Sequence, residues 1–364
     1  MMLNDVTLRE GDQMPGREYT TQQKIEAARM LDDLGLPYIQ PAFPATGEKD
    51  QTVINDLSGT TDAKIIALAR SLERDIDVAV DANADIVETF ISVSDRHLEH
   101  LLDTSREEML TMLTEAIEYI IDRGVTPHVT LADAFRTDHS NIREVFETIP
   151  DVPLVTLADT VGARTPVTVE SYLTSLEDDI DLSRLGVHFH DDLGCATANV
   201  LAAYQAGVAK ADVSIASLGE RAGNSALEEV VAACAVDLND DLDIETTKLA
   251  PTCKQVLTTL EETHNDRKAV LGEKTTEHES GIHTAAMLSD PATLEPYDPA
   301  IFGGIRKLIF GKPTGKTAIR KLLERADIQP TEDRVSTFGT LLTEQGPLDQ
   351  NEALALATQT FEDN

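Results

Sequence analysis

The regular alternation of apolar runs with helical stretches constrains the fold of this chain more strongly than any other feature. Up to about residue 238, short apolar runs rich in Val and Ile alternate with stretches that have the periodicity of amphipathic helices. Such runs are typical of buried parallel strands, and eight of them can be counted, at residues 3–8, 37–40, 63–68, 86–91, 126–131, 154–158, 185–190 and 211–215. This eightfold alternation predicts an α/β fold, a (β/α)8 TIM barrel, with a doubly wound open sheet as the alternative.

Two of the expected helices carry clear signals at their ends. The amphipathic stretch Thr21–Leu34 is followed by Gly35, a residue type that favours helix C-termini. Ser105 stands three residues before Glu108, which is the spacing of a capping box, and the stretch that it opens ends before Gly124. Further helices are expected at 197–206 and 224–236.

The alternation stops after residue 238, and the remaining sequence has a different character. A chain of 364 residues is longer than the roughly 250 residues of a TIM barrel. The later part contains a polar loop, Gly272–His283, among helical patterns at 249–264, 312–326, 331–344 and 349–361. We therefore expect a barrel at residues 1–238, joined near 239–243 to a mostly helical region at 239–364.

Charge and composition narrow the classes of partner. The chain has 65 Asp and Glu residues against 30 Lys and Arg residues, a formal net charge of −35 that is spread along the sequence. Such a surface argues against nucleic acid and anionic membranes as partners, because both attract positive charge. It is typical of halophilic proteins, with an ordinary acidic protein as the alternative. The sequence shows no signal peptide or long apolar span, so a cytoplasmic protein is expected.

Polar residues gather where the predicted strands end, and in a TIM barrel these C-terminal ends form the active site. His188 and His190 are two residues apart on a strand, so their side chains share a face, about 6 to 7 Å apart at Cα. Neutral imidazoles are common metal ligands, although two hydrogen-bonded histidines of a half-buried strand are the alternative. Polar residues at the other strand ends support an active site at this face: Arg9, Glu10, Gln40, Arg70, Glu88, Thr130, Asp133, Asp159, Thr160, Glu220 and Asn224.

Four motifs occur in order along the chain. They are Leu8-Arg-Glu-Gly-Asp-Gln13 followed by Pro15-Gly16, His188-Phe-His-Asp-Asp-Leu-Gly194, Gly219-Glu-Arg-Ala-Gly-Asn224 and His278-Glu-Ser-Gly-Ile-His283. From about Asp5 to Lys321, the chain resembles the isopropylmalate, homocitrate and citramalate synthase family, whose wider relatives are the hydroxymethylglutaryl-CoA lyases. The resemblance implies an acyltransferase that condenses acetyl-CoA with a 2-oxo acid and releases CoA. A 2-isopropylmalate synthase of leucine biosynthesis is expected first, followed by a homocitrate or citramalate synthase.

The same resemblance implies a divalent metal, Mg²⁺, Mn²⁺ or Zn²⁺, at the barrel mouth. By matching motif positions, its ligands would be Glu10, His188, His190 and Asn224. One carboxylate, two imidazoles and an amide oxygen leave positions on an octahedral ion open for the 2-oxo acid.

Roles for other side chains follow from the resemblance as well. Arg9 would face the thioester and ketone oxygens, with an ion pair to Glu220, itself a candidate catalytic residue, as the structural alternative. His283 would reach the site from the appended region, often that of a partner subunit, as a proton shuttle. A homodimer is therefore expected. The candidate substrate-binding residues are Gln13, Gln40, Thr130 and Thr160, of which the last would bind the oxo acid carboxylate.

The chain departs from the family pattern at five places in or near the expected site, one of which is Ala285, where the family has Asp. Gln40 and Ala132 stand where family members have Glu, Glu88 stands where they often have His, and Leu294 replaces a common Tyr, although Tyr297 lies three residues on. These departures motivate a catalytically weak paralogue that binds a small acid or a partner synthase as an alternative function. A lyase that runs carbon–carbon cleavage is the other alternative.

Overall fold

The computed structural model describes residues 1–361, which form two compact units that meet in the sequence between Thr263 and His264. The first unit extends beyond the joint expected at 239–243 because one more helix, α11 (Leu249–Thr259), packs on it. The backbone N–H of Glu245 donates to the carbonyl of Leu34, and the side chain of Gln23 donates to the carbonyl of Thr259. No helix within residues 1–361 combines the length and the apolar character that a membrane span requires.

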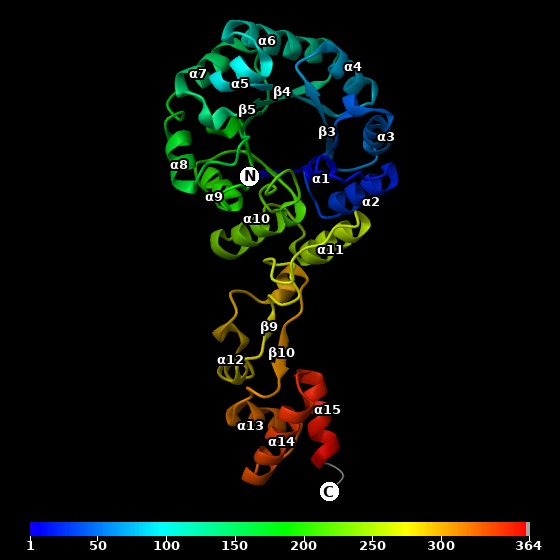
Figure 1. The fold of residues 1–364 in the computed structure, drawn as a ribbon, viewed down its shortest axis with the longest axis vertical. Helices are drawn as coiled ribbons and strands as arrows, with labels where there is room; N and C mark the ends of the chain where they lie inside the picture. Colours follow the sequence, from blue (N-terminus) through cyan, green and yellow to red (C-terminus); the bar gives the residue numbers. More distant parts are fainter. Residues whose placement is uncertain (362–364) are drawn as a thin grey trace. The chain divides into compact units, whose positions relative to one another are not determined.

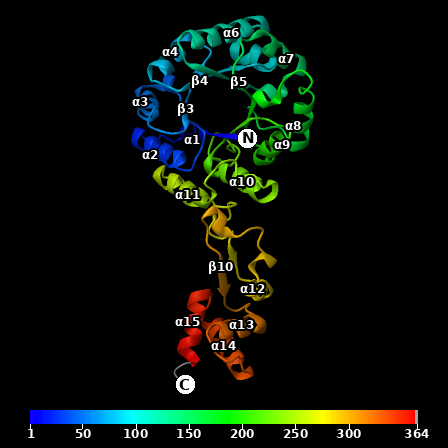
Figure 2. The same ribbon diagram turned by 180° about the vertical axis from the view of Figure 1, so that it is seen from behind.

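The first unit is a closed barrel of eight parallel strands, as the alternation predicted. Each strand pairs with its neighbours in sequence and the last pairs with the first; the strands are β1 (Met2–Asp5), β2 (Tyr38–Ala42), β3 (Lys64–Arg70), β4 (Ile86–Ser92), β5 (Thr126–Ala132), β6 (Val155–Asp159), β7 (Leu185–Phe189) and β8 (Lys210–Val213). Helices surround the strands (Figure 1), and the view from behind shows the same ring (Figure 2). These helices are α1 (Thr7–Asp12), α2 (Thr21–Asp32), α3 (Glu48–Leu57), α4 (Glu73–Asp81), α5 (Asp95–His97), α6 (Arg106–Asp122), α7 (His139–Thr148), α8 (Pro166–Thr174), α9 (Ala196–Gln205) and α10 (Leu227–Ala233).

The first strand is shorter than the sequence predicted, and the correction bears on the site. We expected a strand at 3–8, but β1 ends at Asp5 and the helix α1 begins at Thr7. The buried carboxylate of Asp5 accepts hydrogen bonds from the backbone N–H of Thr7 at 3.0 Å and from its hydroxyl at 2.8 Å. This local turn ends the strand, so that Arg9 and Glu10 lie on a short helix directly after it.

The segments after β7 and β8 also differ from expectation in their limits. β7 ends at Phe189, and His190 lies just beyond it in an isolated antiparallel bridge with Asn224. A helix was expected from Asn224, but α10 begins only at Leu227, because Asn224 and Ala226 are held by bridges to His190 and Ser214. The helix signals at Ser105 and Gly35 are confirmed by a capping box at Ser105 and a φ of +94° at Gly35.

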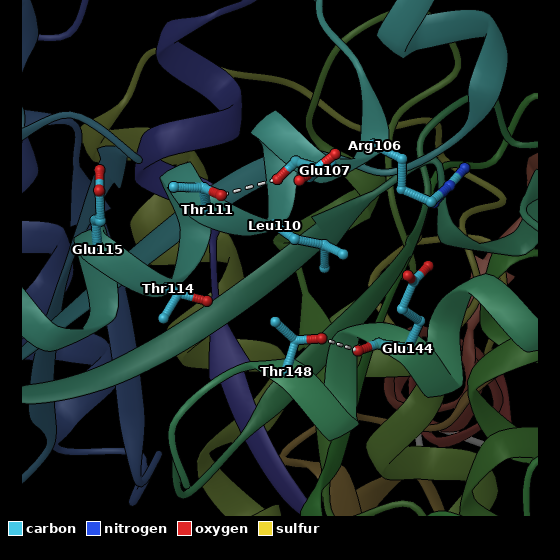
Figure 3. A pocket seen from close by; sticks show the side chains of 8 residues that line it. All are labelled: Arg106, Glu107, Leu110, Thr111, Thr114, Glu115, Glu144 and Thr148. Atoms are coloured by element: carbon cyan, nitrogen blue, oxygen red, sulfur yellow. Dashed lines mark hydrogen bonds between the residues drawn. The ribbon is translucent and has the colours of Figure 1, made fainter.

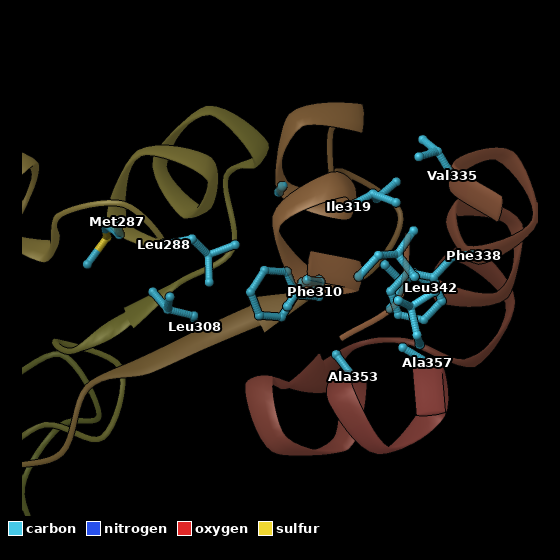
Figure 4. Packing of buried hydrophobic residues seen from close by; sticks show 14 residues of the cluster. Met287, Leu288, Leu308, Phe310, Ile319, Val335, Phe338, Leu342, Ala353 and Ala357 are labelled. Atoms are coloured by element: carbon cyan, nitrogen blue, oxygen red, sulfur yellow. The ribbon is translucent and has the colours of Figure 1, made fainter. Parts of the chain in front are cut away.

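The second unit is mostly helical, as predicted, and has its own apolar core. Its helices are α12 (Gly281–Met287), α13 (Lys316–Arg325), α14 (Glu332–Gln345) and α15 (Gln350–Phe361). A three-stranded sheet in the order β11 (Leu348–Asp349), β10 (Lys307–Phe310), β9 (Glu277–His278) was not predicted, because strands of two to four residues are too short to show a periodic pattern. Figure 4 shows Phe310 of β10 and Phe338 of α14 in the cluster of buried side chains, and both are fully buried.

Candidate metal centre and active site

A cavity of about 260 Å³ opens where the barrel strands end. Side chains from many of the strands and from α1 reach it, as expected for the C-terminal face of a TIM barrel. Nine of the site residues proposed from the sequence line this cavity: Arg9, Glu10, Gln13, Gln40, Thr130, Thr160, His188, His190 and Glu220. Residues that are 180 or more positions apart in the sequence thus meet at one site.

Glu10, His188 and His190 form a buried group that could hold a metal ion. One ligand atom from each lies within 4.8 Å of the others. Nε2 of His188 is 3.4 Å from Nε2 of His190 and 3.9 Å from Oε1 of Glu10. A carboxylate and two imidazoles converging at these distances are suitable ligands for a divalent transition metal or Mg²⁺.

Asn224 is placed beside this group by the loop Gly219–Asn224. A Cβ atom at Gly219 would lie 2.2 Å from Nδ2 of Asn224 and 3.3 Å from Oε2 of Glu10, so glycine is required for this approach. Nδ2 of Asn224 donates to the carbonyl of Leu218 at 3.1 Å. Its Oδ1 is buried and accepts no hydrogen bond from the described residues, which fits an oxygen that faces a cation.

Electrostatics keep Glu10 and His190 in the protonation states that metal binding requires. Burial, followed by the charges of His188 and Arg221, lowers the pKa of His190 to about 3 despite the opposing effect of Glu10, so its imidazole is neutral at ordinary pH. Burial works against ionisation of Glu10, but the charge of Arg9 and then those of the two histidines hold the pKa of this carboxyl below its usual value. The site therefore offers a carboxylate at Glu10 and a neutral ring at His190.

The side chain of Arg9 contacts both Glu10 and Gln40 of the neighbouring strand β2. Its guanidinium pairs with Glu10, and its Nε donates to Oε1 of Gln40 at 2.9 Å. The alternative of an ion pair between Arg9 and Glu220 is wrong for this structure. Glu220 lines the same cavity, but its half-exposed side chain pairs with Arg221 at 3.8 Å.

A buried polar network below the cavity was missed by the sequence reasoning. Lys210, fully buried on β8, lies 3.3 Å from Oδ1 of Asp212 and 3.4 Å from both carboxylate oxygens of Glu88. Asp212 also lies 3.1 Å from Nδ1 of His188 and accepts a hydrogen bond from Asn4 at 2.8 Å. The available signal was two charged residues at alternate positions of a strand that is otherwise apolar.

The remaining polar residues of the strand ends divide into two groups. Thr160 lines the cavity, and its Oγ1 accepts a hydrogen bond from the backbone N–H of Asp133 at 2.8 Å, which leaves its own proton free to donate to a ligand. Arg70, Asp133 and Asp159 do not line the cavity. Arg70 pairs with Asp75, and Asp133 pairs with Arg136, so both are engaged in local ion pairs.

His283 is not among the residues that the barrel brings together. It belongs to the second unit, where it is exposed on α12. His278 lies in β9 of the same unit, and burial lowers its pKa.

A larger cavity of the first unit has no group of side chains that resembles Glu10, His188 and His190. It measures about 620 Å³ and lies on the outside of the barrel between α6 and α7 (Figure 3). Its lining consists of Thr and Glu side chains with Leu110 and Arg106, and it contains no histidine. The smaller cavity at the barrel mouth is therefore the candidate active site.

Comparisons with known proteins identify the family of both parts of the chain. The HMGL-like family model matches residues 1–256, and the model described as homocitrate synthase post-HMGL domain-like matches residues 270–345. The chain is 38% identical to homocitrate synthase AksA of Methanopyrus kandleri over 338 residues, which is 92% of this chain and 85% of that protein. It is also 38% identical to 2-isopropylmalate synthase of Methanocaldococcus jannaschii over 332 residues, which is 90% of this chain and 64% of that protein.

The barrel is similar to solved structures as well. The hydroxymethylglutaryl-CoA lyase of Bacillus subtilis superimposes with a TM-score of 0.63 over 72% of this chain and 94% of that chain. The two sequences are 21% identical, so this likeness concerns the fold.

Proposed function

The chain belongs to the HMGL-like family, and we propose that it is an acyltransferase that condenses acetyl-CoA with a 2-oxo acid and releases CoA. The observation that carries the proposal is the combination of the Glu10, His188 and His190 group with a following segment, residues 270–345, that matches a homocitrate synthase domain. The named relatives are synthases that act on different 2-oxo acids. A 2-isopropylmalate synthase is the first candidate, followed by homocitrate and citramalate synthases.

The residues present fit a divalent metal ion held by Glu10, His188, His190 and Asn224. When bound, such an ion supplies Lewis acidity at the ketone of the 2-oxo acid. The hydroxyl of Thr160 is available to donate to the carboxylate of that acid and so fixes its orientation.

Arg9 supplies fixed positive charge beside this position. Gln40 and Glu10 hold its guanidinium in place, so no reorganisation is needed when negative charge develops on an oxygen nearby. We assign to Arg9 the stabilisation of the enolate oxygen that forms when the acetyl group loses a methyl proton. The enolate carbon attacks the ketone carbon and forms the new carbon–carbon bond, while the π bond of the ketone breaks and its oxygen takes up a proton. Water then hydrolyses the thioester, which releases CoA.

We further propose that His283 moves the methyl proton and that it acts in the barrel of a partner chain within a homodimer. The proposal rests on the motif His278–His283. The test is exchange of the methyl protons of acetyl-CoA with deuterium from the solvent. Exchange by the wild-type protein but not by a His283→Ala variant would support this role of His283. A monomeric mass by light scattering, or unchanged exchange in the variant, would contradict it.

Release of free thiol from acetyl-CoA tests the proposed function. The reaction should be followed with 2-oxoisovalerate, 2-oxoglutarate and pyruvate, with Mg²⁺ or Mn²⁺ and in high salt. We expect thiol release that requires both the oxo acid and the metal. Absence of release with all three acids would contradict the proposal.

A further inference from the structure

We propose that the 2-oxo acid accepted by this barrel is a monocarboxylic acid with a small apolar side chain, and that an acid with a second carboxylate is excluded. The inference rests on the proposed condensation. It concerns the wall of the cavity opposite Glu10, His188 and His190. Glu88 of β4 and its contacts carry it.

The position of the oxo acid side chain follows from the positions of the other groups. We place the ketone of the oxo acid at Glu10, His188 and His190, and its carboxylate at Thr160. The side chain of the acid then faces the wall formed by β2, β3, β4 and β5. This wall presents Leu68, Phe90 and Ala132 together with Gln40, Glu88 and Thr130.

The polar groups of this wall are already engaged with one another. The carboxylate of Glu88 accepts a hydrogen bond from Nε2 of Gln40 at 2.8 Å and another from the hydroxyl of Thr130. Oε1 of Gln40 in turn accepts from Nε of Arg9 at 2.9 Å. A polar side chain on the substrate would have to break one of these bonds, whereas an aliphatic one would only contact Leu68, Phe90 and Ala132.

The charges on this wall also oppose a second carboxylate. Glu88 and Asp212 both reach the cavity, whereas the lysine that neutralises them, Lys210, is fully buried and does not line it. Among the described residues that line the cavity, Arg9 is the one Lys or Arg, and it already pairs with Glu10.

The remaining basic group on this side gives no compensation. His128 lies beside Glu88 in the register of β4 and β5 and is buried. Burial and the nearby charge of Lys210 lower its pKa to about 4, so it carries no charge at neutral pH. A distal carboxylate would thus be desolvated next to Glu88 without a cation to pair with, which is strongly unfavourable.

The test compares 2-oxoisovalerate and pyruvate with 2-oxoglutarate on the full chain loaded with Mn²⁺. We expect kcat/KM for the better aliphatic acid to exceed that for 2-oxoglutarate by roughly 100-fold or more, since an unpaired buried charge must be accommodated. Equal or better turnover of 2-oxoglutarate would overturn the inference and leave the proposed condensation intact. If no acid is turned over, the condensation fails, and calorimetric binding of 2-oxoisovalerate against 2-oxoglutarate still decides the substrate class.

A variant identifies Glu88 as the source of the discrimination. Glu88→Gln preserves the shape and the acceptor for Gln40 while removing the negative charge, so the preference against 2-oxoglutarate should shrink by about tenfold or more. Glu115→Gln, the same exchange at an exposed site on α6, should leave the ratio unchanged. An unaltered ratio in Glu88→Gln would contradict the role of this residue.

Discussion

Nδ1 of His188 lies 3.1 Å from Oδ2 of Asp212, and both side chains are buried. When this nitrogen carries the ring proton and donates it to the carboxylate, the lone pair of Nε2 faces Glu10 and His190. Asp212 therefore sets the tautomer and the ring orientation that a metal ligand needs, and Lys210 and Asn4 hold Asp212 in turn.

Asp212→Asn should weaken metal binding by about 10- to 100-fold. The carboxylate of Asp212 orients the imidazole of His188 and raises its basicity, and the variant removes both effects. Titration of the metal-free protein with Mn²⁺, followed by calorimetry, measures this change. Asp50→Asn is the matched control, since Asp50 is also buried and also pairs with a lysine, Lys24. An equal loss of Mn²⁺ affinity in both variants would indicate general destabilisation rather than a role for Asp212.

Arg9→Lys should lower kcat by about 10²- to 10³-fold while Mn²⁺ affinity stays within a few-fold of wild type. A lysine keeps the charge but cannot pair with Glu10 and donate to Gln40 at the same time, so the charge is no longer fixed in position. Steady-state kinetics and Mn²⁺ titration separate the two effects. Arg74→Lys, at an exposed position of α4, should behave as wild type; a full rate in Arg9→Lys would exclude the assigned role.

His128 should make the metal-free protein less stable in acid. Its folded-state pKa of about 4 lies below the ordinary 6.5, so the unfolded chain takes up a proton as the pH falls below 6.5 while the folded chain does not until about 4. Through this window the free energy of unfolding decreases, by about 2 kcal/mol for this group between pH 7 and pH 5. Urea denaturation at both pH values should show a smaller loss in His128→Phe than in wild type, whereas parallel losses would argue against the assignment.

Salt should stabilise the protein. A formal net charge of −35 causes repulsion in the folded chain, and raising KCl from about 0.1 M to about 1 M shortens the screening length from about 10 Å to about 3 Å. We expect the melting temperature to rise by several degrees over this range, measured by circular dichroism. A melting temperature that is independent of KCl would contradict a halophilic adaptation.

The barrel could be predicted because each of its strands is a separate apolar run followed by a helical stretch, and the strand order of a TIM barrel is the order in the sequence. The residues at which the strands end were harder to predict. A side chain that hydrogen-bonds its own backbone, as Asp5 does with Thr7, ends a strand without interrupting the apolar pattern. The helix α1, and with it the position of Arg9, could not be located for this reason.

The convergence of Glu10, His188 and His190 could be predicted from their motifs, since the barrel topology brings the ends of β1, β7 and β8 together. The network of Lys210, Asp212 and Glu88 could not, because no motif marks these residues and Glu88 of β4 meets Lys210 and Asp212 of β8 only through side chains. The partners of Arg9, Glu10 and Gln40, were missed for another reason, since the direction of its side chain depends on the helix α1, which was not predicted.

Carbon-13 NMR of the product made from acetyl-CoA labelled in its methyl group tests the central claim most directly. Condensation predicts that, in the presence of Mn²⁺ and an oxo acid, the label appears in a methylene group next to a carbon that bears a hydroxyl and a carboxylate, together with one equivalent of free CoA. His188→Ala should remove this signal. Labelled acetate as the sole product, or unreacted acetyl-CoA with every oxo acid, would contradict the assignment of this barrel as a condensing acyltransferase.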